Sequence, residues 1–134
     1  MVFDRSVKQE RFQLEAPLAP DFQPVVRLII GGIAEQVDFG FEEIDDLQLA
    51  VERLLAEAGR SGTVSLTFDV DEGRVRTRVG PLNERSIAVA LQEDSAPGEL
   101  TLRRILQTVV DSFGVEEAAD GGIVVRLEKL RGPG

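Results

Sequence analysis

The segment EIDDLQLAVERLLAEAG, residues 43–59, carries charged side chains at a spacing that could support chemistry. On one helix, Asp46, Arg53 and Glu57 would form a row with Ala50, opposite the apolar side. A carboxylate in this row could hold a cation through oxygen, whereas a guanidinium cannot accept a proton. The same row also fits the solvated face of a surface helix, with Arg53 paired to Glu57 or Asp46. The sequence therefore leaves two alternatives for this row, a degenerate catalytic site and a solvent-exposed helix face without a function.

Several residue types that commonly do chemistry are missing from the chain. There is no Cys and no His, which excludes thiolate chemistry, disulfides and imidazole as a general base or metal ligand. Tyr and Trp are also absent, so stacking of nucleic-acid bases on aromatic side chains is not expected.

The charge and hydropathy of the chain favour a cytoplasmic protein that binds neither nucleic acid nor membrane. Fifteen basic residues stand against 24 acidic ones, for a net charge of −9, which repels nucleic acid and anionic lipid. No apolar run approaches the roughly 20 residues that a membrane span needs, and the N-terminus MVFDRSVKQERF is too charged for a secretory signal. The acidic surface suits a basic partner, although it could equally serve only to keep the protein soluble.

Hydrophobic periodicity and turn signals divide the 134 residues into alternating elements of one domain, with frayed ends at 1–9 and 131–134. Two glycines inside the first helix, Gly31 and Gly32, predict either close packing or a kink. The predicted elements are a strand at 10–17, a helix from Asp21 as N-cap to Gly40, a helix at 43–59, a hairpin at 63–79 around the turn DEG, a loop at 80–98 with a short helix near 86–91, a helix from Glu99 to Phe113 with Gly114 as its C-cap, and a second hairpin at 115–130.

This order predicts an α+β fold, a two-layer α/β sandwich. The two hairpins imply a mostly antiparallel sheet, and three amphipathic helices would cover one of its faces. We expect six apolar side chains to meet between the two layers, namely Leu54, Ile105 and Val109 from the helices and Leu66, Phe68 and Val125 from the sheet.

The order of elements, with DDLQLAV opening the second helix and ADGGIVVRLEKL ending the chain, resembles the bacterial anti-sigma regulatory factors. These are serine kinases of the GHKL ATPase superfamily, named after gyrase, heat-shock chaperone, histidine kinase and mismatch-repair proteins. The resemblance runs from about Glu10 to Leu130 and implies the histidine-kinase-like ATPase fold. In this family the second helix carries a Glu that acts as base and, four residues later, an Asn that holds magnesium beside the nucleotide phosphates.

The resemblance places Arg53 at the family's Glu and Glu57 at its Asn, on the row that Asp46 begins. An arginine cannot act as the base, and a carboxylate at position 57 would repel phosphate. Asn83 is the only asparagine of the chain, so no shift in alignment restores a Glu–Asn pair in this helix.

Both glycine boxes of the family are altered as well. The first, Asp-x-Gly-x-Gly, corresponds to RVGPL, in which Arg78 stands for the adenine-binding Asp, Gly80 is kept and Leu82 replaces the second glycine. The second box, at the start of the third helix, corresponds to ELTL, in which Glu99 and Thr101 replace glycines whose backbone approaches the phosphates. We expect Arg53, Arg78 and a turn at Pro81–Leu82 to close the former pocket.

The altered boxes on a retained scaffold predict a pseudo-ATPase, a non-catalytic protein-binding domain in bacterial transcription regulation. It would have no catalytic residue, no metal and no cofactor, and the resemblance implies a sigma factor or an anti-sigma antagonist domain as its partner. Two alternatives stay open. One is an active serine kinase that uses ATP and magnesium through unusual ligands, and the other is a structural domain that assembles as a homodimer or larger homo-oligomer.

Overall fold

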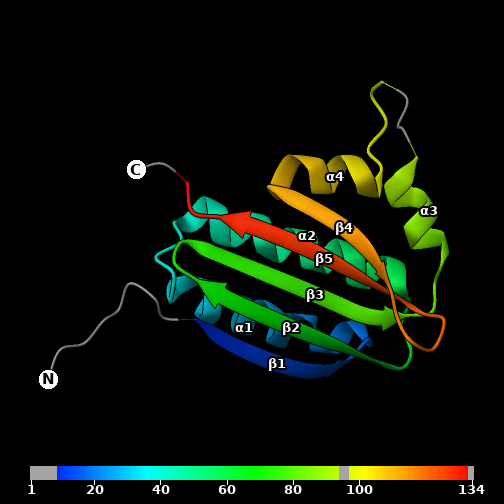
Figure 1. Cartoon of the computed structure of the whole chain (residues 1–134), viewed down its shortest axis with the longest axis horizontal. Helices are drawn as coiled ribbons and strands as arrows, with labels where there is room; N and C mark the ends of the chain where they lie inside the picture. The colour runs from blue at the N-terminus through cyan, green and yellow to red at the C-terminus, as the bar shows by residue number, and fades with distance from the viewer. Residues whose placement is uncertain (1–8, 94–96, 133–134) are drawn as a thin grey trace, which may run out of the picture.

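The computed structural model describes residues 9–93 and 97–132. Figure 1 shows how the elements follow one another along the chain. Their order is β1 (Glu10–Pro17), the 3-10 turn η1 (Pro20–Phe22), α1 (Gln23–Glu35), α2 (Phe41–Ala58), β2 (Thr63–Asp71), β3 (Arg74–Leu82), α3 (Ser86–Gln92), α4 (Leu102–Val109), β4 (Ser112–Glu117) and β5 (Ile123–Leu130). Of the ends expected to fray, residues 1–8 and 133–134 lie outside the described part. Arg131 donates its backbone N–H to Gly73 over 2.7 Å, and Gly132 donates its own to Glu43 over 3.2 Å.

The strands form one sheet in the order β1-β2-β3-β5-β4, and every neighbouring pair is antiparallel. Both predicted hairpins are confirmed, since β2 pairs with β3 and β4 pairs with β5. The first hairpin turns at Glu72 and Gly73, where Gly73 takes the positive φ of 68° that the turn requires. The pairing of β3 with β5 joins the two hairpins and places β1 and β4 at opposite edges of the sheet.

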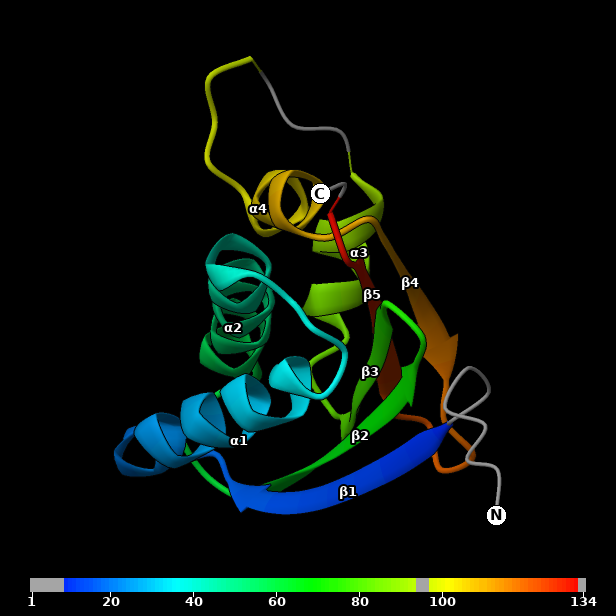
Figure 2. The ribbon, with the colours of Figure 1, turned by 90° about the vertical axis from the view of Figure 1, so that its left-hand side faces the viewer.

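The helices lie together on one face of the sheet, and its other face carries no helix among the described residues (Figure 2). The expected two-layer sandwich is therefore confirmed. Four α-helices form the layer, because the short segment beginning at Ser86 is helical in addition to the three longer ones. No helix in the described part of the chain has the length and apolar character that crossing a bilayer requires.

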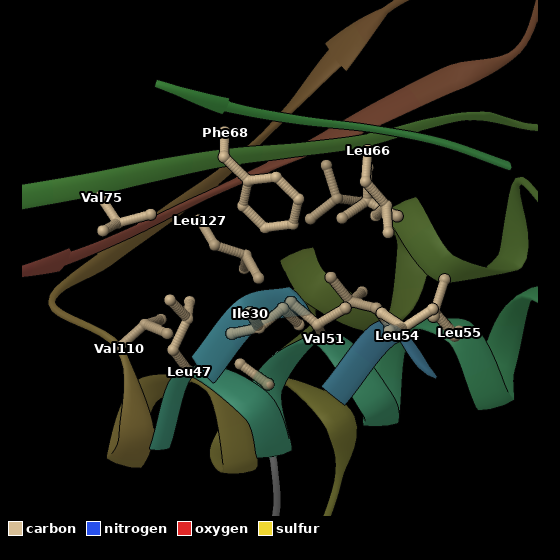
Figure 3. Packing of buried hydrophobic residues seen from close by; sticks show 14 of the residues in the cluster. Ile30, Leu47, Val51, Leu54, Leu55, Leu66, Phe68, Val75, Val110 and Leu127 are labelled. Carbon is tan, nitrogen blue, oxygen red and sulfur yellow. The ribbon is translucent and has the colours of Figure 1, made fainter. Parts of the chain in front are cut away.

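The core lies between the helices and the sheet (Figure 3). The side chains that fill it come from alternate strand positions and from the inner side of each helix, among them Ile30, Leu47, Val51, Leu54, Leu66, Phe68, Val75, Leu106, Val125 and Leu127. Of the six residues expected between the layers, five are buried, and Ile105 is only partly buried.

The first predicted helix differs from the structure at both ends. Asp21 lies in the turn η1 rather than at an N-cap, and α1 begins at Gln23 with Pro24 in its first turn. The helix ends at Glu35, and Gly40 caps the start of α2 instead, where its N–H donates to the Glu43 carboxylate. The residues between the two helices make single turns, which periodicity alone does not separate from a helix.

The third predicted helix was too long, since α4 spans only Leu102–Val109. It starts late because Thr101 is its N-cap, with the hydroxyl accepting from the Arg104 N–H over 3.2 Å. It ends early because Phe113 and Gly114 belong to β4, where they pair with β5. A short apolar run such as the one around Phe113 fits a helix or a strand. It forms a strand here because β5 offers an unpaired edge with which it can pair.

Close packing, rather than a kink, accounts for Gly31. A Cβ at this position would lie 3.3 Å from the Gln48 Nε2 of α2, whereas one on Gly32 would meet nothing within 4 Å. The same Gln48 amide donates to the Arg27 carbonyl of α1 over 2.9 Å, so the absent side chain allows the two helices to approach.

Thr77 of β3 is the buried polar residue of the described core, and its hydroxyl has no hydrogen-bond partner there. A hydroxyl taken out of water without a partner costs about 1–3 kcal/mol. We expect Thr77→Val to raise the free energy of unfolding by about 1 kcal/mol, measured by urea denaturation. Thr67→Val on the half-exposed side of β2 is the control and should change it by less than about 0.5 kcal/mol. Destabilisation by Thr77→Val would show that the hydroxyl is satisfied in solution.

Candidate functional site

The helix α2 lies between α1 and α4, so each of its two flanks faces another helix (Figure 2). On the first flank, Arg27 of α1 pairs with Glu52 at 2.6 Å and with Asp45 at 3.0 Å. The row of Asp46, Ala50, Arg53 and Glu57 begins on the second flank, where Asp46 pairs with Lys129 of β5 and α4 packs against α2. We expected this row to lie opposite the apolar side as a solvent-exposed face. That expectation is wrong for Asp46 and Ala50, because Asp46 pairs with Lys129 and Ala50 is buried.

Asp46 is tied to two other elements through one lysine. Its carboxylate accepts from the Lys129 Nζ of β5 over 3.1 Å, and the same amine donates to the Val109 carbonyl at the end of α4 over 2.8 Å. The Lys129 side chain is 12% exposed. Asp46 therefore holds α2, α4 and β5 together at this end of the row.

The rest of the row changes from buried to exposed along α2. Ala50 has no exposed surface, so the middle of the row is covered by the protein itself. Arg53 and Glu57 lie 3.9 Å apart, and each side chain is about half exposed. An exposed pair of this kind contributes a few tenths of a kcal/mol. No three acidic side chains of residues 9–93 and 97–132 are grouped so that they could hold a metal ion.

Arg78 does not meet Arg53, contrary to the expected closure of one pocket by both. On β3, the side chains of Val75, Thr77 and Val79 face the helices, and Arg78 alternates to the outer face of the sheet. There its guanidinium donates to Asp69 over 3.1 Å and to Glu116 over 3.2 Å.

Gly80 and Leu82 have structural roles at the end of β3. A Cβ on Gly80 would lie 2.6 Å from the backbone oxygen of Ile123, and its φ is 147°, so only glycine fits this approach to β5. The expected turn at Pro81–Leu82 is instead part of β3, with a cis peptide at Gly80-Pro81 and a shift in register toward β5. Leu82 is 3% exposed and packs in the core.

The start of α4 is capped by its own chain. Thr101 takes the N-cap position, so one of the free N–H groups that could bind an anion is already satisfied. Glu99 lies ahead of the cap and is exposed, rather than being the first residue of the helix as expected.

The segment that precedes α4 is anchored by two arginines. Arg85, at the start of α3, donates to both Glu117 carboxylate oxygens, over 2.8 and 3.3 Å, and to the Gly121 carbonyl over 2.7 Å. These hydrogen bonds, followed by the charge of the guanidinium, lower the pKa of Glu117. Arg103 of α4 donates to the Gln92 carbonyl over 2.9 Å, at the end of α3. The helix expected near residues 86–91 is confirmed, and residues 94–96 lie outside the described part of the chain.

Sequence reasoning missed Lys129, although a signal for it exists. Ile123, Val125 and Leu127 alternate toward the core, and the next inward position of β5 is Lys129. A lysine at an inward strand position requires a buried partner or a carbonyl acceptor. That signal points to a tie such as the one with Asp46.

Comparison with known proteins places the chain beside one group of enzymes. No protein-family model matches the chain. It is similar to proteins named serine-protein kinase RsbW: 30% identical over 138 aligned positions to one from Bacillus licheniformis (strain ATCC 14580) and 28% over 139 to one from Bacillus pumilus, each alignment covering 88% of this chain and 84% of the relative. A third, from Bacillus velezensis, is 26% identical over 123 positions, which cover 91% of this chain and 74% of the relative. The resemblance seen in the sequence is thereby confirmed, and the chain belongs to the RsbW serine-protein kinase family.

Proposed function

We propose that this chain is a single regulatory domain of the anti-sigma type, which binds a protein partner through its helix layer and does not transfer phosphate. The partner that the family favours is a sigma factor or the antagonist domain that releases it. The observation that carries the proposal is an exposed apolar stripe on α1, and the altered nucleotide boxes support the second half of it.

The stripe consists of three residues spaced three apart, namely Phe22 at the N-cap of α1 and Val25 and Leu28 within the helix. They are 44%, 50% and 76% exposed. Grouped apolar side chains on a surface are typical of a contact with another protein. The charge of −9 favours a partner whose contact surface is basic around an apolar centre.

We expect Leu28→Glu to weaken binding of the sigma factor encoded nearest this protein's gene by at least about tenfold, measured by calorimetric titration. Leu100→Glu is the matched control, because Leu100 is also a highly exposed leucine, at 81%, but lies ahead of α4. Its effect should stay within about twofold. Equal losses in both variants, or none in either, would contradict α1 as the docking surface.

Four features support the loss of nucleotide binding. At the position of the family's base, Arg53 has no group that accepts a proton. Ala50 is fully buried in the middle of the row, Leu82 fills the position of a glycine, and Thr101 caps the helix at which phosphates would lie. These residues leave little of the donor set that a nucleotide with magnesium requires.

The expected result is that millimolar ATP with magnesium leaves the melting temperature of the protein unchanged. A nucleotide present at about 100 times its Kd would add about 2.7 kcal/mol to the stability, and hence several degrees to the melting temperature. The Bacillus licheniformis relative, tested alongside, serves as the positive control.

The name serine-protein kinase, carried by the relatives, favours an active ATP-dependent kinase as the second candidate. A saturable, magnesium-dependent rise in the melting temperature, with phosphate transferred to a serine of the antagonist domain, would establish that alternative. Partner binding, together with a melting temperature that ATP and magnesium do not change, would support the pseudo-ATPase hypothesis.

A further inference from the structure

The two edges of the sheet differ in how they are protected. β1 carries the charged Arg11 and Glu15 on its outer face and ends in Pro17, which are common devices against the addition of another strand. β4 is the last strand at the other edge, and its first four residues, SFGV, contain neither charge nor proline (Figure 2).

The two carboxylates at the end of β4 are already paired. Glu116 accepts from Arg78 over 3.2 Å, and Glu117 accepts from Arg85 over 2.8 Å. The charged residues of β4 thus lie at its end, and Ser112–Val115 form the uncharged stretch of this edge.

A hollow of about 450 Å³ on the outer face of β1–β3 is lined mainly by charged side chains, whereas several apolar side chains contribute to the lining of one of about 390 Å³ beside β4. The residues that line the second hollow are Leu91, Gln92, Arg103, Phe113, Gly114 and Val115. Phe113 and Val115 pair with Leu127 and Val125, which are buried on the helix side, so their own side chains point to that side. Both remain partly exposed, and apolar surface next to an open strand edge is thus available.

On the opposite face of β4, a guanidinium lies across the strand. Arg126 pairs with Gly114 in register, and a Cβ on Gly114 would be only 2.6 Å from the Arg126 Nη2. The arginine therefore extends over the space that this glycine leaves, toward the open edge. Its ion pair with Glu116 is long, at 4.0 Å, and its side chain is 34% exposed.

From this arrangement we infer that β4 accepts an extended segment of a partner protein as a sixth strand, one in which apolar and acidic side chains alternate. The backbone of the segment would pair with the open edge, which is a common mode of peptide recognition. Its apolar side chains would enter the hollow beside Phe113 and Val115, and an acidic side chain on the other face would meet Arg126. Alternate residues of a strand point to opposite faces, so one segment satisfies both requirements. The site lies on the sheet edge rather than on α1, and it does not depend on the proposed function.

The test starts with a display library of random peptides about eight residues long, selected on the folded protein. The expected binders alternate apolar residues with Asp or Glu. When the best of them is added to isotope-labelled protein, the amide resonances of residues 112–116 should shift while those of β1 stay in place. Selection that yields no binder, binders without this alternation, or shifts centred on β1 or α1 would overturn the proposal.

Matched variants test the charge contact. Arg126→Glu should lower the affinity for the selected peptide by at least about tenfold. Arg11→Glu, on the outer face of the other edge, should change this affinity by less than about twofold. Arg126→Gln serves in its place if the reversal of charge prevents folding, and it should still cost several-fold. Equal effects at both edges would overturn the contact with Arg126. Shifts of the β4 amides that follow protein concentration without any peptide would identify a second copy of the chain as the occupant instead.

Discussion

Gly80→Ala is expected to destabilise the protein by about 3 kcal/mol, which lowers the melting temperature by roughly 10 °C. The added Cβ would lie 2.6 Å from the Ile123 carbonyl oxygen, a backbone atom that cannot swing away. The φ of 147° is also a conformation that side-chain-bearing residues rarely adopt. Because β3 and β5 join the two hairpins here, the strain falls on the centre of the sheet.

Gly121→Ala separates the two causes. Gly121 has a φ of 90° but nothing within 4 Å of its would-be Cβ, so its replacement should cost only the backbone strain, about 1–2 kcal/mol. Both variants are measured by thermal and urea denaturation. Equal losses would mean that the close approach to Ile123 contributes nothing, and the structural reason for this glycine would fail.

The second large effect is expected at Asp46. Asp46→Ala leaves the Lys129 ammonium, with its side chain 12% exposed, in contact with the Val109 carbonyl alone. Removing one partner of a fully buried pair costs about 3–5 kcal/mol. Since the Asp46 side chain is 36% exposed, we expect a smaller loss of about 2 kcal/mol in the free energy of unfolding.

The neighbouring residue provides the control for this prediction. Asp45 pairs with Arg27 at 3.0 Å, but its side chain is 59% exposed, so Asp45→Ala should cost less than about 0.5 kcal/mol. The double variant Asp46→Ala with Lys129→Met should recover most of the loss, because an apolar side chain needs no partner in that position. Additive losses in the double variant would show that the two residues act independently.

Ion pairs tie both flanks of α2 to neighbouring elements. On one flank Arg27 is held by Asp45 and Glu52, and on the other Asp46 is held by Lys129. α2 is thus fixed to α1, α4 and β5 by residues of this chain. We expect such a fixed helix layer to serve as a docking surface whether or not a nucleotide binds.

Several features follow from the sequence because their causes are local. Alternating apolar residues, together with the glycines of the DEG and GG turns, predict both hairpins, and periodicity predicts α2 nearly to its ends. The alternation of Val75, Thr77 and Val79 even contains the information that Arg78 faces away from the helices. The residue types at positions 53, 57 and 99 are likewise visible in the sequence, and their replacement of the family's ligands stays a prediction.

Other features are decided only when distant segments meet. The sequence shows the row from Asp46 to Glu57, but α4 and β5 determine which half of it is covered, and Lys129 reaches Asp46 across 83 positions. The run around Phe113 fits a helix or a strand until β5 offers it a partner. Gly80 resembles a turn glycine until the Ile123 carbonyl is placed against it. Periodicity and turn chemistry reflect a residue's nearest neighbours, so the sequence by itself determined the order of most elements and the family. Contacts between elements decided where several helices end and which face each charged residue occupies.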